Sequence, residues 1–204
     1  MEHARRKTGR PLSFDREAAL HSAMLLFWRH GYEATSLADL TAAMGITPPS
    51  LYAAYGDKKR LFLAAVDLYL SGPVTTEGII DNAPSARAAA LGLLQAGAIG
   101  NTGADTPPGC LLATAAISCS AGAADVQAEL AAIRGRIVDA LRGRISKDIA
   151  AGVLPPGTDA DALAAYVMAL LQGLSTLARD GAPRDRLLRV IDVAMLCWPS
   201  REPG

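Results

Sequence analysis

Aromatic residues and regular polar–apolar alternation are scarce in this chain, which argues against a β fold. Phe, Trp and Tyr make up 5% of the 204 residues, whereas alanine is abundant, and this balance favours closely packed helices over a sheet of β-branched and aromatic strands. No stretch of about four to eight residues alternates cleanly between apolar and polar side chains. We therefore predict an all-α fold.

Sequence signatures of enzymes are also missing. The three histidines, His3, His21 and His30, lie within the first 30 residues, and none has a metal-ligand partner at a suitable spacing. The chain contains no glycine-rich phosphate loop, no Gly-x-Ser-x-Gly turn and no Cys-x-x-Cys pair. We expect no enzyme activity, no metal site and no cofactor.

Cysteine and long apolar runs are limited. Three cysteines, with no secretory apolar region at the start of the chain, predict a cytoplasmic protein. The longest wholly apolar run, from Ala162 to Leu171, is about half the length needed to span a bilayer. No membrane partner is expected.

Net charge is formally zero, but it is unevenly distributed. Residues 1–60 hold nine Lys or Arg against six Asp or Glu, and the remainder hold eleven against fourteen. Most of the excess is in Arg5, Arg6, Lys7 and Arg10, a polar tail too short to fold alone.

The segment after residue 35 contains closely spaced signals for helix starts and stops. Ser36 and Asp39 predict a cap, and Leu37, Leu40 and Met44 follow at helical spacing before Gly45 ends the helix. Thr47 is the next predicted cap, with Pro48 at the first helical position. In that short helix Leu51 and Tyr55 point inward, and Gly56 and Asp57 end it before Lys58, Lys59 and Arg60 open another. These three cations oppose the helix dipole unless an anion, such as phosphate, lies nearby.

Helices are predicted along the rest of the chain as well. The first runs from Phe14 and Asp15 to Gly31, with an apolar stripe that covers the two short helices, and another runs from Lys58 to about Leu70. Proline and glycine clusters divide the remainder into predicted helices over 84–100, 109–121, 124–151, 159–179 and 184–197.

The frame T-S-L-x-x-L-x-x-x-x-G-I-x-x-x-x-L-Y-x-x-Y-x-x-K-x-x-L over Thr35–Leu61, preceded by Phe27-Trp28-Arg29-His30-Gly31-Tyr32, resembles the TetR family of bacterial transcriptional regulators, of the AcrR-like type. The resemblance is specific over about the first 65 residues. Pro48-Pro49 and Ala53-Ala54 depart from the common pattern, which weakens any inference about the bases read. The resemblance implies a DNA-binding domain over residues 1–57 and a helical ligand-binding and dimerisation domain over residues 58–204.

Such a regulator is expected to be a repressor that binds a palindromic double-stranded DNA operator as a homodimer and is released by a small-molecule inducer. The predicted DNA-binding residues are Thr35, Thr47, Pro48, Pro49, Ser50, Tyr52, Lys58, Arg5, Arg6 and Arg10. Thr47, Ser50 and Tyr52 offer hydrogen bonds to base edges or phosphates, the prolines offer apolar surface to thymine methyl groups, and Lys58 matches the family's phosphate-gripping position. The basic tail is alternatively a disordered, solubilising start, and the motif alternatively an ordinary helical hairpin in a core.

Ligand and dimer contacts are less specific in the sequence. Ligand-binding candidates are Cys110, Thr114, Ser118, Tyr166, Met168 and Gln172, although small residues such as these also allow helices to pack closely. Dimerisation candidates are Leu163, Val167, Leu170, Leu174, Leu187, Ile191 and Met195, which share apolar stripes that an intrachain core would show equally.

Two other functions remain open from the sequence. A thiol-based redox sensor would use Cys110 and Cys119, but on one continuous helix these lie about 13 Å apart, too far for a disulfide. A helical scaffold for protein partners would explain the apolar helices over residues 84–197 and leave the N-terminal segment unexplained.

Overall fold

The computed structural model describes residues 14–116 and 120–200, and within them the regular structure is entirely helical. The predicted contributions of Arg5, Arg6, Lys7, Arg10, Ser118 and Cys119 lie outside the described residues. The elements in order are α1 (Arg16–His30), α2 (Leu37–Met44), α3 (Pro48–Tyr55), α4 (Lys58–Leu70), α5 (Thr76–Asn82), α6 (Ala86–Gly100), α7 (Leu111–Thr114), the 3-10 turn η1 (Ala121–Ala123), α8 (Ala124–Ala150), α9 (Ala160–Arg179) and α10 (Arg184–Met195).

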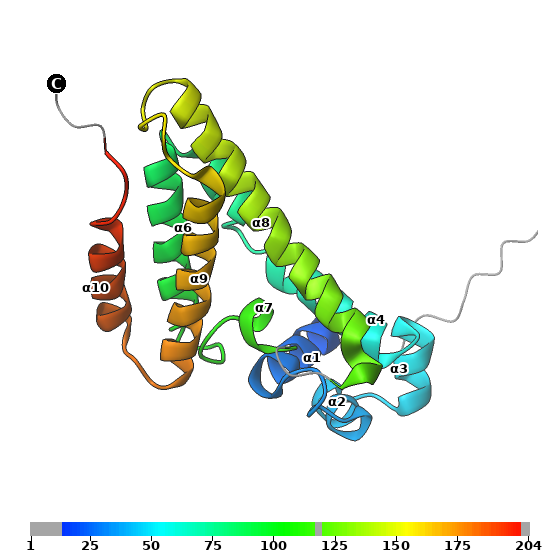
Figure 1. Ribbon diagram of the computed structural model, residues 1–204. Helices are drawn as coiled ribbons and strands as arrows, with labels where there is room; N and C mark the ends of the chain where they lie inside the picture. Colours follow the sequence, from blue (N-terminus) through cyan, green and yellow to red (C-terminus); the bar gives the residue numbers. More distant parts are fainter. Residues whose placement is uncertain (1–13, 117–119, 201–204) are drawn as a thin grey trace, which may run out of the picture.

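Helices α1 to α4 form a head at one end, and α6, α9 and α10 stand side by side at the other (Figure 1). The long helix α8 runs diagonally from the head to the far end of the body. The short helix α7 lies between the two parts, so it is placed to touch both.

The head helices begin at the predicted caps. Asp15 accepts hydrogen bonds from the backbone N–H groups of residues 17 and 18, and Ser36 and Asp39 form the reciprocal capping box. Gly45 ends α2 in the left-handed conformation, with φ of 65°. Thr47 stands at the N-cap of α3, but its hydroxyl pairs with that of Ser50 at 3.0 Å, so the predicted cap bond to the backbone is wrong.

Two hydrophobic cores organise the chain. The first joins α1 to α4 with α7 and the start of α8, and Phe27 and Phe62 meet edge to face in it with ring centroids 5.0 Å apart. The second joins α5, α6, α9 and α10 with the rest of α8. Because α4 belongs to the first core, the packing unit of the head extends beyond residue 57; the domain boundary at 57/58 stays a prediction.

The connection between α6 and α8 differs from the prediction. The helix expected over 109–121 is confined to Leu111–Thr114 in the described residues, and α5 was not expected. The carbonyl oxygen of Ala115, the C-cap residue of α7, accepts from the N–H of Tyr32 at 2.8 Å, which ties the end of this helix to the head. Residues 115 and 116 are not helical, so α7 ends before Cys119, which lies outside the described residues, and the separation of Cys110 and Cys119 stays a prediction.

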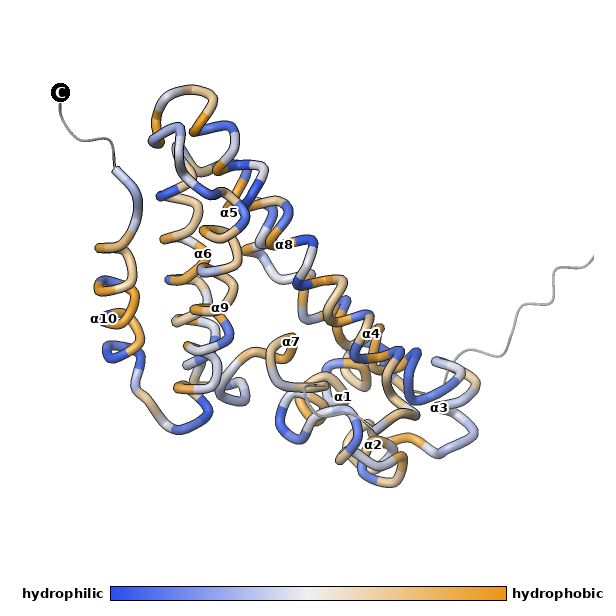
Figure 2. Tube along the Cα trace, in the orientation of Figure 1, coloured by the Kyte–Doolittle hydropathy of each residue, from blue (hydrophilic) through white to orange (hydrophobic). Residues whose placement is uncertain are grey.

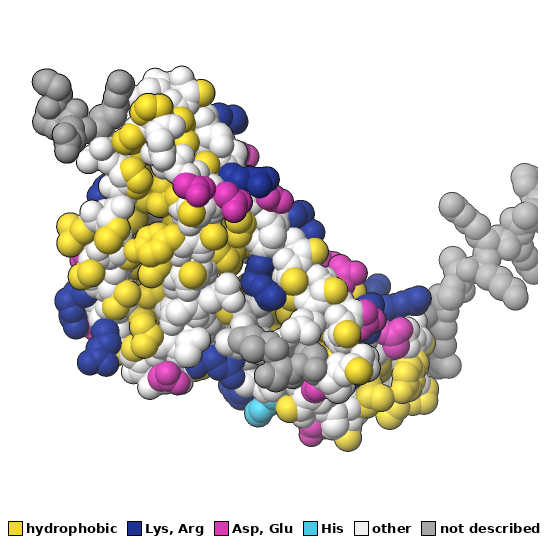
Figure 3. Space-filling view, viewed as in Figure 1, with side chains coloured by type: hydrophobic (Ala, Val, Ile, Leu, Met, Phe, Trp, Pro, Cys, Tyr) yellow, Lys and Arg dark blue, Asp and Glu magenta, His cyan; other side chains and the backbone are white. Residues whose placement is uncertain are grey.

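Helix α9 is long and apolar enough to span a membrane by length and composition alone. It packs against α6, α8 and α10, but only part of its surface is covered by them. Figure 2 shows apolar residues along α6, α9 and α10, and Figure 3 shows apolar side chains gathered on the surface over α9 and α10. An apolar face is thus left uncovered at the end of the molecule remote from the head.

Candidate DNA-binding and ligand sites

The outer side of α3 is the exposed tip of the head. Thr47, Pro48, Pro49 and Ala53 are exposed, Ser50 is half-buried, and the Tyr52 side chain is 49% exposed. None of these side chains is charged, so the tip offers hydroxyl groups and apolar surface. Such groups suit base edges and thymine methyl groups in a major groove.

The inner side of α3 holds that tip in position. Leu51 is fully buried, and Tyr55 is 7% exposed, with its hydroxyl donating to the carbonyl oxygen of Arg16 at 3.0 Å. The Arg16 guanidinium lies over the Tyr55 ring, 5.1 Å from its centroid, and donates to the carbonyl oxygen of Ala54. Helix α1 therefore fixes α3 from the side opposite to the exposed tip.

Thr35 does not belong to the exposed tip. Its side chain is 1% exposed, and its hydroxyl donates to the carbonyl oxygen of Gly31 at 2.6 Å. This bond closes the turn between α1 and α2, so the assignment of Thr35 as a DNA-contacting residue is corrected: it is a structural residue of the head.

The cations of the first turn of α4 have partners within the chain. Lys58 lies over the ring of Tyr32 at 4.5 Å, and burial lowers its pKa while the nearby Glu33 carboxylate opposes that shift. Lys59 forms an ion pair with Asp125 on α8 at 2.6 Å, and this contact raises the pKa of Lys59 and lowers that of Asp125. Arg60 lies 3.7 Å from Asp57. Helix α4 is thereby tied to the start of α8.

Sequence comparison places this head and body among known regulators. The family described as "Bacterial regulatory proteins, tetR family" matches residues 19–65, and "Tetracyclin repressor-like, C-terminal domain" matches residues 95–191. The HTH-type transcriptional repressor ComR of Escherichia coli (strain K12) is 34% identical over 197 residues, which cover 96% of this chain and 94% of ComR. The chain belongs to the TetR family.

Solved structures of TetR family regulators share the whole fold. A cysteine-substituted mutant of CifR, complexed with 26-base-pair operator DNA, superposes with a TM-score of 0.88 at 42% identity over 94% of this chain and all of that one. The HTH-type repressor BdcR of Escherichia coli (strain K12) is 45% identical over 65 residues, 32% of this chain and 33% of BdcR. The protein is accordingly a DNA-binding transcriptional regulator of the TetR family and not an enzyme.

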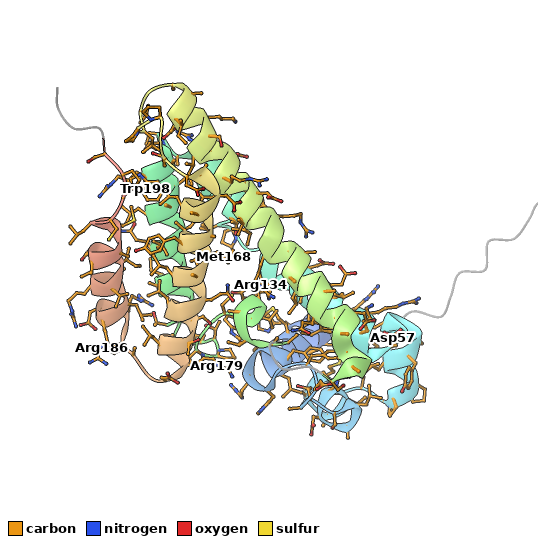
Figure 4. The ribbon with its side chains drawn as sticks, in the orientation of Figure 1. Asp57, Arg134, Met168, Arg179, Arg186 and Trp198 are labelled. Atoms are coloured by element: carbon orange, nitrogen blue, oxygen red, sulfur yellow. The ribbon has the colours of Figure 1, made fainter. Side chains whose placement is uncertain are left out.

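A cavity of about 730 Å³ lies in the body of this TetR family protein, between α4, α5, α6, α8 and α9. Its walls are mostly apolar, which is typical of small-molecule sites. Three of the predicted ligand residues line it: Cys110, Met168 and Gln172. Figure 4 shows Met168 on the side of α9 that is turned towards α8.

Two other predicted ligand residues, Thr114 and Tyr166, do not line this cavity, so their assignment stays a prediction. Thr114 donates to the carbonyl oxygen of Cys110 and accepts from Arg179, which places it between α7 and α9. Tyr166 donates to the carbonyl oxygen of Ala194 at 3.1 Å and so joins α9 to α10. Both hydroxyls are used in holding helices together.

Several wall residues were missed from the sequence, among them Trp28, Tyr69, Asn101, Arg134 and Arg136. Tyr69 donates to the Cys110 thiol at 3.3 Å, and burial, followed by the nearby Cys110, raises the pKa of its phenol. The feature of the sequence that could have indicated this role is the position of Tyr69 near the end of the predicted helix that begins at Lys58. Tyr69 therefore connects the cavity to the helix that begins beside the exposed tip of α3.

Five of the predicted dimer contacts are buried inside the single chain: Val167, Leu174, Leu187, Ile191 and Met195. Leu163 and Leu170 are half-buried against the same core. The five buried side chains are corrected to core residues, because they have no surface to offer a partner. Large apolar side chains that are exposed instead are Leu177 on α9, Val193 on α10 and Leu196 just after α10, which are 38%, 65% and 82% exposed.

Proposed function

We propose that this TetR family protein is a cytoplasmic repressor that binds a palindromic operator as a homodimer and is released when a small molecule enters the cavity. The observation that carries the proposal is the arrangement of three surfaces in one chain. The exposed tip of α3 lies at one end, the uncovered apolar face of α9 and α10 at the other, and the cavity between them.

The dimer follows from the size of the reading surface. Helix α3 has eight residues, about 12 Å in length, and reaches only a few base pairs. Each good base contact discriminates by roughly 1–3 kcal/mol, so a second copy related by twofold symmetry supplies the specificity that one head lacks.

The apolar face suits a second copy of the same chain. Ala165, Ala169 and Gly173 lie exposed along one side of α9, and small residues there let a facing helix approach closely. Leu177 on α9, Val193 on α10 and Leu196 at the C-cap of α10 add larger apolar surface. Two such helix pairs form a four-helix bundle, which is a common way to bury apolar helix faces.

Release requires that the ligand distinguish two arrangements of the heads. Helix α4 begins at Lys58 beside the reading tip and ends with Tyr69 and Leu70 in the cavity wall. A ligand that displaces the end of α4 also displaces its start, and the two heads then no longer match successive major grooves.

Fluorescence anisotropy with the DNA upstream of the protein's own gene tests this proposal. We expect binding that weakens steeply with salt, because each phosphate contact contributes a slope of about −0.9 in a plot of log K against log[salt]. Sedimentation of the free protein at the same concentration should give a dimer. Salt-independent binding, or binding by a monomer, would contradict the proposal.

A further inference from the structure

The cavity contains two cationic side chains from α8, Arg134 and Arg136. Arg134 is half-buried, and its Nη1 donates to the carbonyl oxygen of Leu112 at 2.6 Å. Figure 4 places Arg134 between α8 and α9, and Figure 3 shows a basic side chain in the hollow at that place. A guanidinium has five N–H donors, so the bond to Leu112 leaves most of them unused.

The cavity arginines differ from the other arginines of α8 in their partners. Arg142 pairs with Asp139 at 2.8 Å, and Arg144 pairs with the buried Asp148 at 3.2 Å. Within residues 14–116 and 120–200, no carboxylate lies within salt-bridge distance of Arg134 or Arg136. A partly desolvated cation without a counter-ion is costly, and an anion at this place would lower that cost.

A second polar residue, Asn101, lines the same cavity. Asn101 is 4% exposed and lines the cavity, so its side-chain amide is held away from bulk water. The backbone carbonyl oxygen of Asn101 accepts from the backbone N–H of Gly109 at 2.9 Å, and the guanidinium of Arg134 donates to the backbone carbonyl oxygen of Leu112. Asn101 and Arg134 therefore contact the two ends of the segment 109–112, and Leu93 and Leu171 are among the apolar residues that line the same cavity.

We infer that the cavity binds an amphipathic organic acid, with one carboxylate held by Arg134 and Asn101 and an apolar body along the remaining walls. The inference rests on the proposed function, in which this cavity is the ligand site. Arg134 supplies charge and a planar pair of donors, and Asn101 supplies a buried amide donor. Arg136, which is exposed, adds positive charge, and the exposed Glu77 is the carboxylate among the described lining residues.

Calorimetric titration of the full-length protein with octanoate, 1-octanol and octylammonium tests the inference, because the three probes share one chain and differ in charge. We expect octanoate to bind about tenfold or more tighter than octanol, as a charge-assisted hydrogen bond predicts, and octylammonium to bind weakest. Equal affinities for octanoate and octanol, tighter binding of octylammonium, or no binding of any probe would overturn the inference.

Substitutions locate the anion site. Arg134→Gln should reduce octanoate affinity to the level of octanol while octanol binding itself, which reports an intact cavity, stays unchanged. Asn101→Ala should weaken octanoate several-fold in the same way, and it provides a second measurement should Arg134→Gln fail to fold. Arg142→Gln is the matched control, because Arg142 lies farther along α8 and pairs with Asp139. This variant should keep the wild-type preference for octanoate over octanol. A preference for octanoate that survives both Arg134→Gln and Asn101→Ala would overturn the inference.

DNA binding separates this inference from the proposed function. If the protein binds its upstream DNA but shows no preference for octanoate, the ligand class is wrong and the repressor proposal stands. If octanoate is preferred through Arg134 but the protein does not bind DNA, the ligand class stands and the repressor proposal is wrong.

Discussion

Arg179 on α9 caps the end of α1, 151 residues earlier in the chain: its Nη1 donates to the carbonyl oxygen of Trp28 at 3.3 Å. The same guanidinium donates to the carbonyl of Arg29 at 3.1 Å and to the Thr114 hydroxyl at 2.9 Å. Cations are favourable at the C-terminal end of a helix, where carbonyl groups lack partners. One side chain therefore joins the body, α7 and the head.

Replacing Arg179 by Met should weaken this junction. We expect the free energy of unfolding to fall by about 1 kcal/mol, because the bonded carbonyls of α1 lose their donors. Arg186→Met on α10, where the exposed side chain points away from the head in Figure 4, should change it by less than about 0.5 kcal/mol. Urea denaturation of the three proteins measures the difference, and equal stabilities of the two variants would contradict a capping role.

Gly109 lies against the same arginine. It has φ of 84°, and an added Cβ would lie 2.6 Å from the Cγ of Arg179 and 3.0 Å from the carbonyl oxygen of Ser175. Gly109→Ala should therefore lower stability through backbone strain of roughly 1–3 kcal/mol and through displacement of Arg179. Gly181→Ala is the matched control, since Gly181 has φ of 89° and nothing within 4 Å of such a Cβ. Thermal unfolding should show a larger loss for Gly109→Ala, and the reverse order would contradict the account.

A charge on the uncovered apolar face should separate the proposed dimer. Val193→Asp places a carboxylate on a side chain that is 65% exposed in the single chain, so we expect a folded monomer with strongly weakened operator binding. Val153→Asp makes the same change at another exposed valine, after α8, and should leave the dimer intact. Sedimentation equilibrium decides the matter: a Val193→Asp dimer as stable as the wild type would mean that this face is not the interface.

The contact between Glu33, which follows α1, and Ser120, which precedes η1, should make the free energy of unfolding sensitive to acid. Ser120 donates to the Glu33 carboxylate from its hydroxyl and from its N–H at 3.0 Å, and these bonds hold the pKa of Glu33 below its usual value of 4.5. A lowered pKa in the folded state means that the stabilisation is complete above pH 4.5 and is lost as the pH falls through the lower folded value.

Glu33→Gln tests this pH dependence. The difference in unfolding free energy between wild type and variant should be constant from pH 5 to 7 and should shrink as the pH falls below 4.5. Glu129→Gln should not reproduce this change, because Glu129 is an exposed residue of α8 and makes no hydrogen bond to the head among residues 14–116 and 120–200. A difference that grows towards acid pH would show that the sign is wrong.

Substitutions at Tyr52 and Leu51 should distinguish a loss of DNA affinity from a loss of stability. Tyr52→Ala removes an exposed ring from the tip of α3, so operator affinity should fall by about 1–3 kcal/mol with stability nearly unchanged. Leu51→Ala removes a fully buried side chain from the head core and should cost about 2–5 kcal/mol of stability. Anisotropy and denaturation on both variants measure the two effects. Unchanged DNA affinity in Tyr52→Ala would contradict the placement of the tip.

The head could be predicted closely from the sequence because local signals determine it. Asp15, Ser36, Gly45 and Asp57 begin or end helices through bonds made within three or four residues, and the structure has those bonds. The connection between α6 and α8 could not be predicted, because α7 ends where distant groups, Tyr32 and Arg179, bind it. Helix propensity contains no information about such partners.

The site residues divide in the same way. The exposed side of α3 follows from the spacing of Leu51 and Tyr55, and so could be predicted, whereas the burial of Thr35 depends on the turn at Gly31. The stripe containing Val167 and Leu187 is equally apolar whether it faces its own chain or a partner, and only the packing shows that it is core. Nothing in the local sequence indicates that Arg134 lines the cavity, because its position there depends on which side of α8 faces α9.

The central claim is that two copies of the α3 tip enter successive major grooves, and hydroxyl-radical footprinting of the operator tests it most directly. The account predicts two symmetric protected patches separated by about 34–36 Å or a multiple of that distance. At a protein concentration just above the wild-type Kd, both patches should weaken strongly with Tyr52→Ala and with Val193→Asp. A single protected patch, or two patches that persist in the Val193→Asp monomer, would contradict the claim.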